Sequence, residues 1–380
     1  MCDSTKMSRR NLLKAGAAGV GAGFLGPNAA ASVVSNYPPN KWGTPGLYPA
    51  RVVKIQHSGS TVSFNYQTGP IQQMIRSGLQ QLTGAPNYVT GWRQFVGPGD
   101  VVGIKINPNG NDGTISSPVV IMEIISGLML AGVDQRNIIV YERYQEILDR
   151  TAGWFPPWVR TMSAAPGYTD DQTGQAGYDP NHYADMPMLL SWQDSANPVH
   201  RRSYAAQFIA SRVNKLINLS CLKHHNAAGV TLALKNLSHG CSNNVNRSHD
   251  YPAQAFPQQF FYTTFIPTVV SMNVIRNKAV LHIIDGIHGL WDYGPNSTSY
   301  AYNWEHKSMY FATDAVAVDR VGWKAIDAQR KSVGLPDVAN STSYVIQGVP
   351  AQPQYIDAAA AAGLGENRDD RIDLRTTVLA

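Results

Sequence analysis

The sequence predicts an α/β fold with a mostly parallel sheet, helices on both faces of that sheet (a Rossmann-like arrangement) and one irregular insertion. Two observations predict it. The chain has 380 residues, of which 43% are apolar and 15% are charged, a composition that excludes a disordered protein and suits one large domain or about two smaller ones. Apolar runs of strand length also alternate with segments of helical period, as in βαβ units with parallel strands.

Residues 1–31 have the features of an export signal. Arg9 and Arg10 precede a Gly/Ala-rich apolar stretch, residues 15–25, and small residues follow as a candidate cleavage region. The paired arginines resemble the twin-arginine signal, although Leu12 stands where that signal often has Phe. We therefore expect a signal peptide over 1–31, passage through the twin-arginine translocase, and a periplasmic or extracellular mature protein with no transmembrane segment.

Charge and cysteine content exclude two further classes. The formal net charge is +5, but residues 1–31 hold four basic side chains and one acidic side chain, so the remaining chain carries only +2. A nucleic-acid partner is therefore not expected. Three cysteines are too few for the four thiolates of an iron–sulfur cluster. We expect no such cluster in this chain, and any electron transfer would require a separate partner.

The first half of the chain supplies most of the predicted sheet. Proline near the first turn of residues 118–131, with Gly132 after the end, is typical of a helix. The predicted elements are, in order, an extended arm (32–50), a strand (51–57), a helix (71–82), a strand (100–106), a helix (118–131) and a strand (138–141). The last three form a βαβ unit.

The second half begins with an irregular segment, residues 151–203, rich in Gly, Asp and aromatic side chains. We interpret it as an insertion that either lies over a site or forms a surface loop. Regular elements then return as a strand (213–219), a strand (279–284) and a helix (315–326). Residues 51–335 are thus the predicted α/β domain, and 336–380 are a C-terminal extension.

The densest cluster of chemically active side chains follows the predicted strand 213–219. It comprises Cys221, Lys223, His224, His225, Lys235, Asn236, His239 and Cys241. Open α/β sheets bind ligands beyond the carboxyl ends of their strands, and a lysine buried there requires a partner. The cluster therefore predicts a site for an anion or a metal ion.

Two cysteines flank this cluster. If residues 227–238 form one helix, they span about 18 Å, which would place Cys221 and Cys241 beyond the roughly 7 Å that a disulfide permits between Cα atoms. Gly229 and the β-branched pair after it weaken that helix, so unbridged cysteines, a disulfide and metal ligation all remain open.

Carboxylates at two other element boundaries are further candidates. Asp285 ends the apolar strand 279–284 and should emerge at the ligand-binding edge. Asp319 lies on an apolar face of helix 315–326, where an unpaired carboxylate is unfavourable by several kcal/mol. We expect Asp319 to point inward and pair with Lys105, Lys223 or Lys235. Asp314, nearer the helix start, should only cap it.

Several segments, read in order, resemble a bacterial and archaeal family known as "domain of unknown function 362". They are V-G-I-K-I-N-P-N (102–109), L-I-N-L-S-C-L-K-H-H (216–225), G-V-T-L-A-L-K-N-L-S-H-G (229–240), I-I-D-G-I-H-G (283–289) and A-T-D-A-V-A-V-D (312–319). The resemblance covers about residues 50–330. The positions that match the family's pattern are Lys105, Asn107, Lys223, His225, Lys235, Asn236, Asp285 and Asp319.

That resemblance implies a fold and a set of positions but no reaction. Many relatives carry fused four-cysteine ferredoxin modules, which this chain lacks. At the level of fold the family also resembles the nickel-pincer lactate racemases, in which a lysine tethers the cofactor.

The functional hypothesis is an exported metal- or cofactor-dependent enzyme acting on an anionic small molecule. Lys223 and Lys235 would hold a carboxylate or phosphate, His225 would transfer a proton, and Asp285 would orient it. Lys105, Asn107 and Asn236 are assigned to cofactor binding, and Asp319, His224 and His239 to a divalent metal. The cofactor is either that metal or a group loaded in the cytoplasm. The alternative is a non-catalytic periplasmic protein that binds a ligand or carries a redox-associated cofactor.

Overall fold

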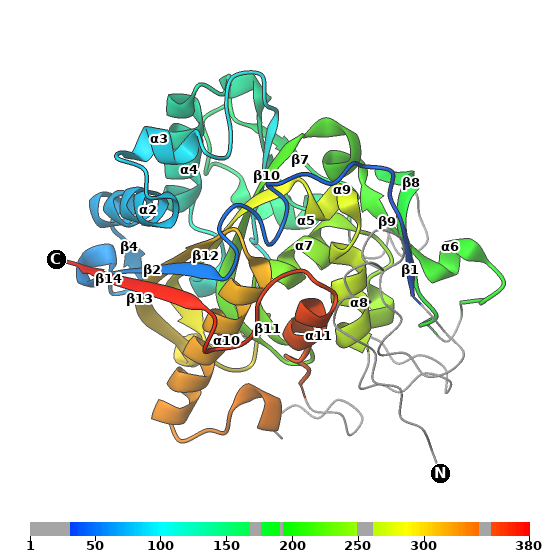
Figure 1. Ribbon diagram of the computed structural model, residues 1–380. Helices are drawn as coiled ribbons and strands as arrows, with labels where there is room; N and C mark the ends of the chain where they lie inside the picture. The colour runs from blue at the N-terminus through cyan, green and yellow to red at the C-terminus, as the bar shows by residue number, and fades with distance from the viewer. Residues whose placement is uncertain (1–30, 168–175, 191–192, 249–260, 342–350) are drawn as a thin grey trace, which may run out of the picture.

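The computed structural model describes residues 31–167, 176–190, 193–248, 261–341 and 351–380 (Figure 1). The predicted signal peptide therefore lies outside the described residues, apart from Ala31.

A nine-stranded mixed sheet forms the centre of the molecule (Figure 1). Strand β10 is parallel to both β5 and β12, β6 is parallel to β5 and β7, and β14 is parallel to β2, whereas β13 is antiparallel to both neighbours. The sheet order is β14 (Asp373–Leu379), β2 (Arg51–His57), β13 (Asn303–Ala312), β12 (Ala279–Leu290), β10 (Lys215–His225), β5 (Val102–Lys105), β6 (Ile138–Tyr141) and β7 (Arg160–Met162), with β11 (Gly229–Thr231) paired to β10. The predicted α/β class with a mostly parallel sheet is confirmed.

Helices cover both faces of this sheet, as predicted. Alternate strand residues enter different cores: Val52 and Leu216 belong to one apolar cluster, and their neighbours Val53 and Ile217 belong to the other. On one face pack α2 (Thr68–Thr83), α3 (Tyr88–Trp92) and α4 (Pro118–Ala131). On the other pack α7 (Ala233–Cys241), α8 (Phe261–Val270), α10 (Ala315–Ser332) and α11 (Tyr355–Ala361).

Helix α4 has the predicted ends. The Ser117 hydroxyl caps its start by accepting from the Val119 N–H, and Gly132 ends it with a φ of 107°, which favours glycine. The segment Asp112–Ala131 is long and apolar enough to cross a membrane, but 67% of it is buried inside the protein. Burial of this kind is typical of a core helix.

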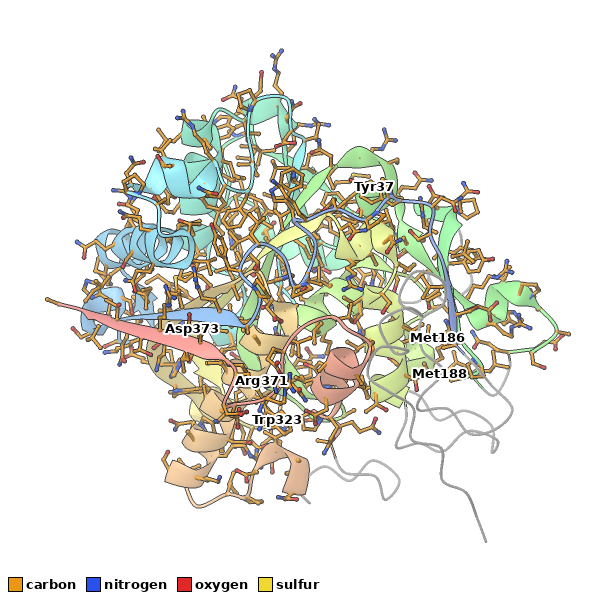
Figure 2. All side chains as sticks on the ribbon, in the orientation of Figure 1. Tyr37, Met186, Met188, Trp323, Arg371 and Asp373 are labelled. Carbon is orange, nitrogen blue, oxygen red and sulfur yellow. The ribbon has the colours of Figure 1, made fainter. Side chains whose placement is uncertain are left out.

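The start of the arm and the insertion pair with each other. Strands β1 (Ser32–Val34), β8 (Tyr178–Asp185) and β9 (Arg202–Ala206) form a three-stranded sheet. Met186 and Met188 follow β8 and are fully buried in the core beside it (Figure 2). The remaining short elements are β3 (Thr61–Val62), β4 (Asn65–Tyr66), α5 (Gln145–Leu148), α6 (Pro198–Arg201) and α9 (Asn273–Arg276).

Two predicted strands are longer than expected, and hydrogen-bonded pairing explains both. The strand predicted over 213–219 continues to His225 because β11 folds back onto it. The strand predicted over 279–284 continues to Leu290 because β13, which the sequence did not predict, pairs along it. Residues 227–238 are not one helix: Gly229 has a φ of 81°, the next two residues complete β11, and α7 starts at Ala233.

Candidate functional site

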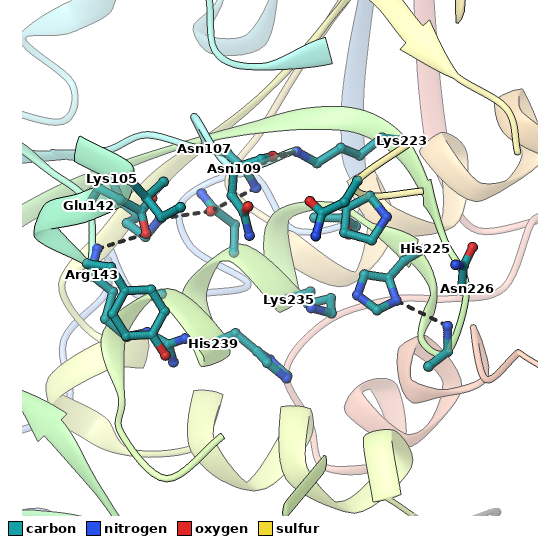
Figure 3. Close-up of a pocket in the computed structure, with 18 of the residues that line it drawn as sticks. Lys105, Asn107, Asn109, Glu142, Arg143, Lys223, His225, Asn226, Lys235 and His239 are labelled. Carbon is teal, nitrogen blue, oxygen red and sulfur yellow. Dashed lines mark hydrogen bonds and ion pairs between the residues drawn. The ribbon is translucent and has the colours of Figure 1, made fainter. Parts of the chain in front are cut away.

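A cavity of about 500 Å³ opens at the carboxyl ends of β5, β6 and β10 (Figure 3). Helix α7 supplies a further wall. The lining residues come from five stretches of chain: Lys105, Asn107 and Asn109; Glu142, Arg143, Tyr144, Glu146 and Ile147; Lys223, His225, Asn226, Ala227 and Thr231; Lys235, Asn236, His239 and Gly240; and Pro295 and Asn296. None of the described residues between 151 and 203 lines it. We call it the Lys235 cavity.

The structure brings seven of the ten predicted site residues to this cavity. They are Lys105, Asn107, Lys223, His225, Lys235, Asn236 and His239. Three parallel strand ends meet there because Lys105 of β5 lies in register with Asn218 of β10 and Tyr141 of β6. Since β10 runs seven residues beyond Asn218, its last residues form one side of the cavity.

Lys105 is bonded on all three of its donors. Its ammonium group donates to the Glu142 carboxylate at 2.7 Å, to the Asn236 side-chain oxygen at 3.1 Å and to the Ile106 carbonyl. Asn236 in turn donates to the Asn218 side-chain oxygen at 2.8 Å. These polar groups satisfy one another and fix the wall where β5 meets α7.

Lys223 is bonded in the same way but without a carboxylate. It donates to the side-chain oxygen of Asn107 at 2.7 Å, to the Asn109 carbonyl and to the Thr114 carbonyl at 3.4 Å. Burial lowers the pKa of its ammonium group to about 8. Because three neutral acceptors take its three donors, Lys223 adds positive charge to the cavity and leaves no N–H for a ligand.

Lys235 differs from both. Its side chain is 7% exposed and lines the cavity, and no acceptor or carboxylate of the described chain bonds its ammonium group. Burial lowers its pKa to about 7, and the positive charges of Arg143, Lys223 and Lys105 act in the same direction. An unpaired buried amine is unfavourable, so this position is suited to a ligand.

The lining as a whole is cationic. Lys105, Lys223, Lys235 and Arg143 oppose only Glu142 and Glu146, and Glu142 is already paired with Lys105. A charge excess of this sign within a partly enclosed space attracts anions.

Two residues of the lining hold buried polar atoms without partners. The Thr231 hydroxyl and the Asn226 side-chain oxygen are buried, and neither has a hydrogen-bond partner within the part of the chain that is described. Thr231 reaches the cavity because β11 pairs it with Lys223. Unsatisfied buried groups are uncommon and costly.

The His225 ring is held by two backbone N–H groups. Its Nδ1 accepts from the backbone N–H groups of Ala227 at 3.2 Å and Ala228 at 3.1 Å. The proton of the neutral ring therefore lies on Nε2. Lys235 and His225 project into the same space (Figure 3).

Asp319 does not lie in the cavity. The expectation that it pairs with a lysine was wrong: its carboxylate accepts from the backbone N–H groups of Ala233 at 2.7 Å and Leu234 at 2.9 Å. Burial raises its pKa, and these two bonds oppose the rise. Asp319 thus supplies from α10 the cap that Leu232, at the start of α7, cannot supply, and so positions Lys235. Asp314 caps α10, as predicted.

Asp285 is also outside the cavity lining. It lies within β12 and accepts from the backbone N–H groups of Ser117 and Ile287, both at 3.2 Å. Burial raises its pKa to about 6. Its carboxylate therefore faces the start of α4, and β12 extends six residues past the predicted end.

The three predicted metal ligands occupy separate surroundings. His224 accepts from the Gly294 N–H and lies 3.7 Å from Asp292, which pairs with buried Arg330. Burial lowers the pKa of His224 to about 4. Across the described ranges, no three His, Cys, Asp or Glu side chains gather as a metal site. Cys221 and Cys241 are both buried and unbridged.

Sequence reasoning missed the residues after β6. Arg143 donates to the Ser242 carbonyl at 3.0 Å and lies over the Tyr144 ring at 4.0 Å, and both line the cavity with Glu142. The signal was available: β6 was a predicted parallel strand, and its carboxyl end lies at the same edge as that of β5.

Comparison with known proteins supports the family resemblance in the region that supplies β10, α7, β12 and most of α10. No curated protein matches the chain. Residues 177–324 match the sequence model of a family described as "Domain of unknown function (DUF362)", and over this segment the chain is similar to that family.

Proposed function

We propose that this protein is an enzyme that binds a small anionic molecule in the Lys235 cavity and transfers protons to and from it. One observation carries the proposal: the Lys235 ammonium group is buried beside three other cations and is bonded to no acceptor of the described chain. An anion would supply the missing partner.

The roles within the cavity follow from the hydrogen bonds. Lys235 has a pKa of about 7, so it can both give and accept a proton near neutral pH. His225 is oriented by two backbone N–H groups and lines the same cavity. Lys105 and Lys223, with their donors already bonded, contribute charge and hold the walls.

A titration with anions tests the binding. We would measure binding of phosphate, sulfate, acetate and succinate to the full chain by calorimetry near pH 6. Lys235→Met should weaken binding of the preferred anion by about tenfold or more, the loss of one charge-assisted bond. Lys324→Met is the matched control, since Lys324 is exposed and pairs with Asp369. Equal affinity in the Lys235→Met variant would reject the site.

Catalysis is tested separately from binding. Hydrogen exchange at the carbon next to the carboxylate of a bound acid, followed in D₂O, would identify proton transfer. Binding without any chemical change in the ligand would favour the alternative, a non-catalytic ligand-binding or cofactor-carrying protein. A divalent metal has no support from the side-chain geometry of the described residues, and a cytoplasmically loaded cofactor rests on the leader sequence alone.

Export through the twin-arginine translocase to the periplasm or the outside of the cell is part of the same proposal. It is supported by Arg9 and Arg10 ahead of the apolar stretch 15–25. The residues concerned lie outside the described ones.

A further inference from the structure

We infer that the molecule bound in the Lys235 cavity is a 2-oxo acid, and that the amine of Lys235 attacks its carbonyl carbon to form an imine. This inference rests on the proposed function, because it uses the same cavity and the same anion.

Lys235 has the surroundings of a nucleophilic amine rather than of a simple counter-charge. A lysine that only binds an anion works best fully protonated, whereas here three cations and burial favour the neutral amine. Desolvation and a neighbouring positive charge are the two means by which enzymes activate a lysine as a nucleophile. With a pKa of about 7, close to half of the amine is neutral at pH 7.

The other cations can attract the carboxylate of the acid without Lys235. Lys223 is buried and bonded only to neutral oxygens, so its charge is not compensated by a carboxylate. Arg143 lines the same cavity. An acid drawn to these charges would bring a carbonyl group at C2 next to the Lys235 amine, which remains available to react.

A partnerless hydroxyl suits the tetrahedral intermediate. The Thr231 hydroxyl belongs to the cavity lining and can donate to the oxygen that was the carbonyl. Thr231 comes four residues before Lys235, at the end of the strand that leads into α7.

The step balances without another reactant. The neutral amine forms a bond to C2, and the carbonyl oxygen gains a proton as the nitrogen loses one, which gives a carbinolamine. Its hydroxyl leaves as water after taking a second proton from solvent. The nitrogen retains its other proton in a protonated imine, which acidifies the C–H bonds at C3 of the acid.

Reductive trapping tests the inference. The full chain would be treated with pyruvate and sodium cyanoborohydride, and the adduct would be located by mass spectrometry of peptides. We expect one adduct, on Lys235, with the mass of pyruvate less one water plus two hydrogens. Lys235→Arg should abolish it, and Lys324→Met, which removes an exposed lysine, should retain it. The trapping rate should rise about fivefold from pH 6 to pH 7, because the neutral amine reacts.

The outcomes separate this inference from the proposed function. Lactate, which has a hydroxyl in place of the carbonyl, serves as the unreactive probe. If lactate and pyruvate both bind in a Lys235-dependent way and no Lys235 adduct forms, the imine is rejected and the anion site stands. If neither binding nor trapping depends on Lys235, both proposals fail. Trapping confined to exposed lysines also rejects the imine.

Discussion

Three lysines that a sequence cannot tell apart have different roles at the residue scale. Lys105 pairs with a carboxylate, Lys223 bonds three neutral oxygens, and Lys235 has no acceptor within the described chain. The difference lies in the backbone around them: Lys223 is opposite the turn after β5, whereas Lys235 is in the first turn of the buried helix α7, where its side chain lines the cavity. Lys105 and Lys223 therefore stabilise the fold, and Lys235 is the lysine available to react.

Lys223→Met should destabilise the fold. The variant leaves the Asn107 side-chain oxygen and two backbone carbonyls without their donor, and an unsatisfied buried acceptor costs about 1–3 kcal/mol. We expect the free energy of unfolding in urea to fall by a few kcal/mol, on the order of 2–4. An unchanged unfolding midpoint would show that these bonds do not hold the turn.

Lys235→Met should stabilise the fold at neutral pH, in contrast. The pKa of Lys235 is about 7 in the folded state against an ordinary value of 10.5, so the unfolded chain binds more protons between these pH values and the native protein gains stability as pH rises. The gain in the free energy of unfolding of the variant over the unmodified protein should be largest below pH 7 and should shrink towards pH 10. Urea unfolding at several pH values checks this, and a pH-independent difference would contradict the low pKa.

At the scale of elements, α7 is positioned by its neighbours rather than by its own sequence. Asp319 of α10 caps its start, and Gly240 near its end lies against Lys105. A Cβ atom at position 240 would come within 2.1 Å of the Lys105 Cε atom. The side chains of α7 that line the cavity therefore depend on contacts at both ends of the helix.

Gly240→Ala should displace Lys105 and disturb the cavity. Such overpacking typically costs about 1–3 kcal/mol, and the expected results are a lower unfolding midpoint and weaker anion binding. Gly69→Ala in α2 is the matched control, because nothing lies within 4 Å of its added Cβ atom. Equal effects of the two variants would exclude a specific role for Gly240.

The pairing of elements also explains which parts of the fold the sequence could predict. The period of apolar residues located β5, α4 and β6 within two residues, since local side-chain pattern decides these elements. It failed where long-range pairing decides: β13 extends β12 and so encloses Asp285, and β11 extends β10. Asp319 was predicted to be buried but not its partner, because a helix N-terminus brought close by the fold has no sequence signature.

At the scale of the whole molecule, the site residues gather at the edge of the sheet where β5, β6 and β10 end. Residues from five segments between Lys105 and Asn296 meet where the parallel strands end, which is the placement expected for an open α/β sheet. Positions at strand ends were predictable for this reason. Glu142 and Arg143 were equally placed by the rule and were passed over because no motif marked them.

Export concerns the whole chain and is predicted from its leader. Changing both Arg9 and Arg10 to lysine should leave full-length precursor in the cytoplasm, because the paired guanidinium groups are what the twin-arginine receptor reads. Cell fractionation with an antibody to the protein measures this. Undiminished periplasmic protein from the double variant would contradict a twin-arginine signal.

The central claim is that Lys235 is an unpaired buried amine that binds an anion. Titration of the Lys235 amine tests this claim most directly. The pKa of the Lys235 amine can be followed by NMR of the ¹³C-labelled side chain, with its signal assigned by its loss in Lys235→Met. The account predicts a pKa of about 7 without ligand and a clear rise when phosphate or acetate binds. A value near the ordinary 10.5, unchanged by either anion, would contradict it.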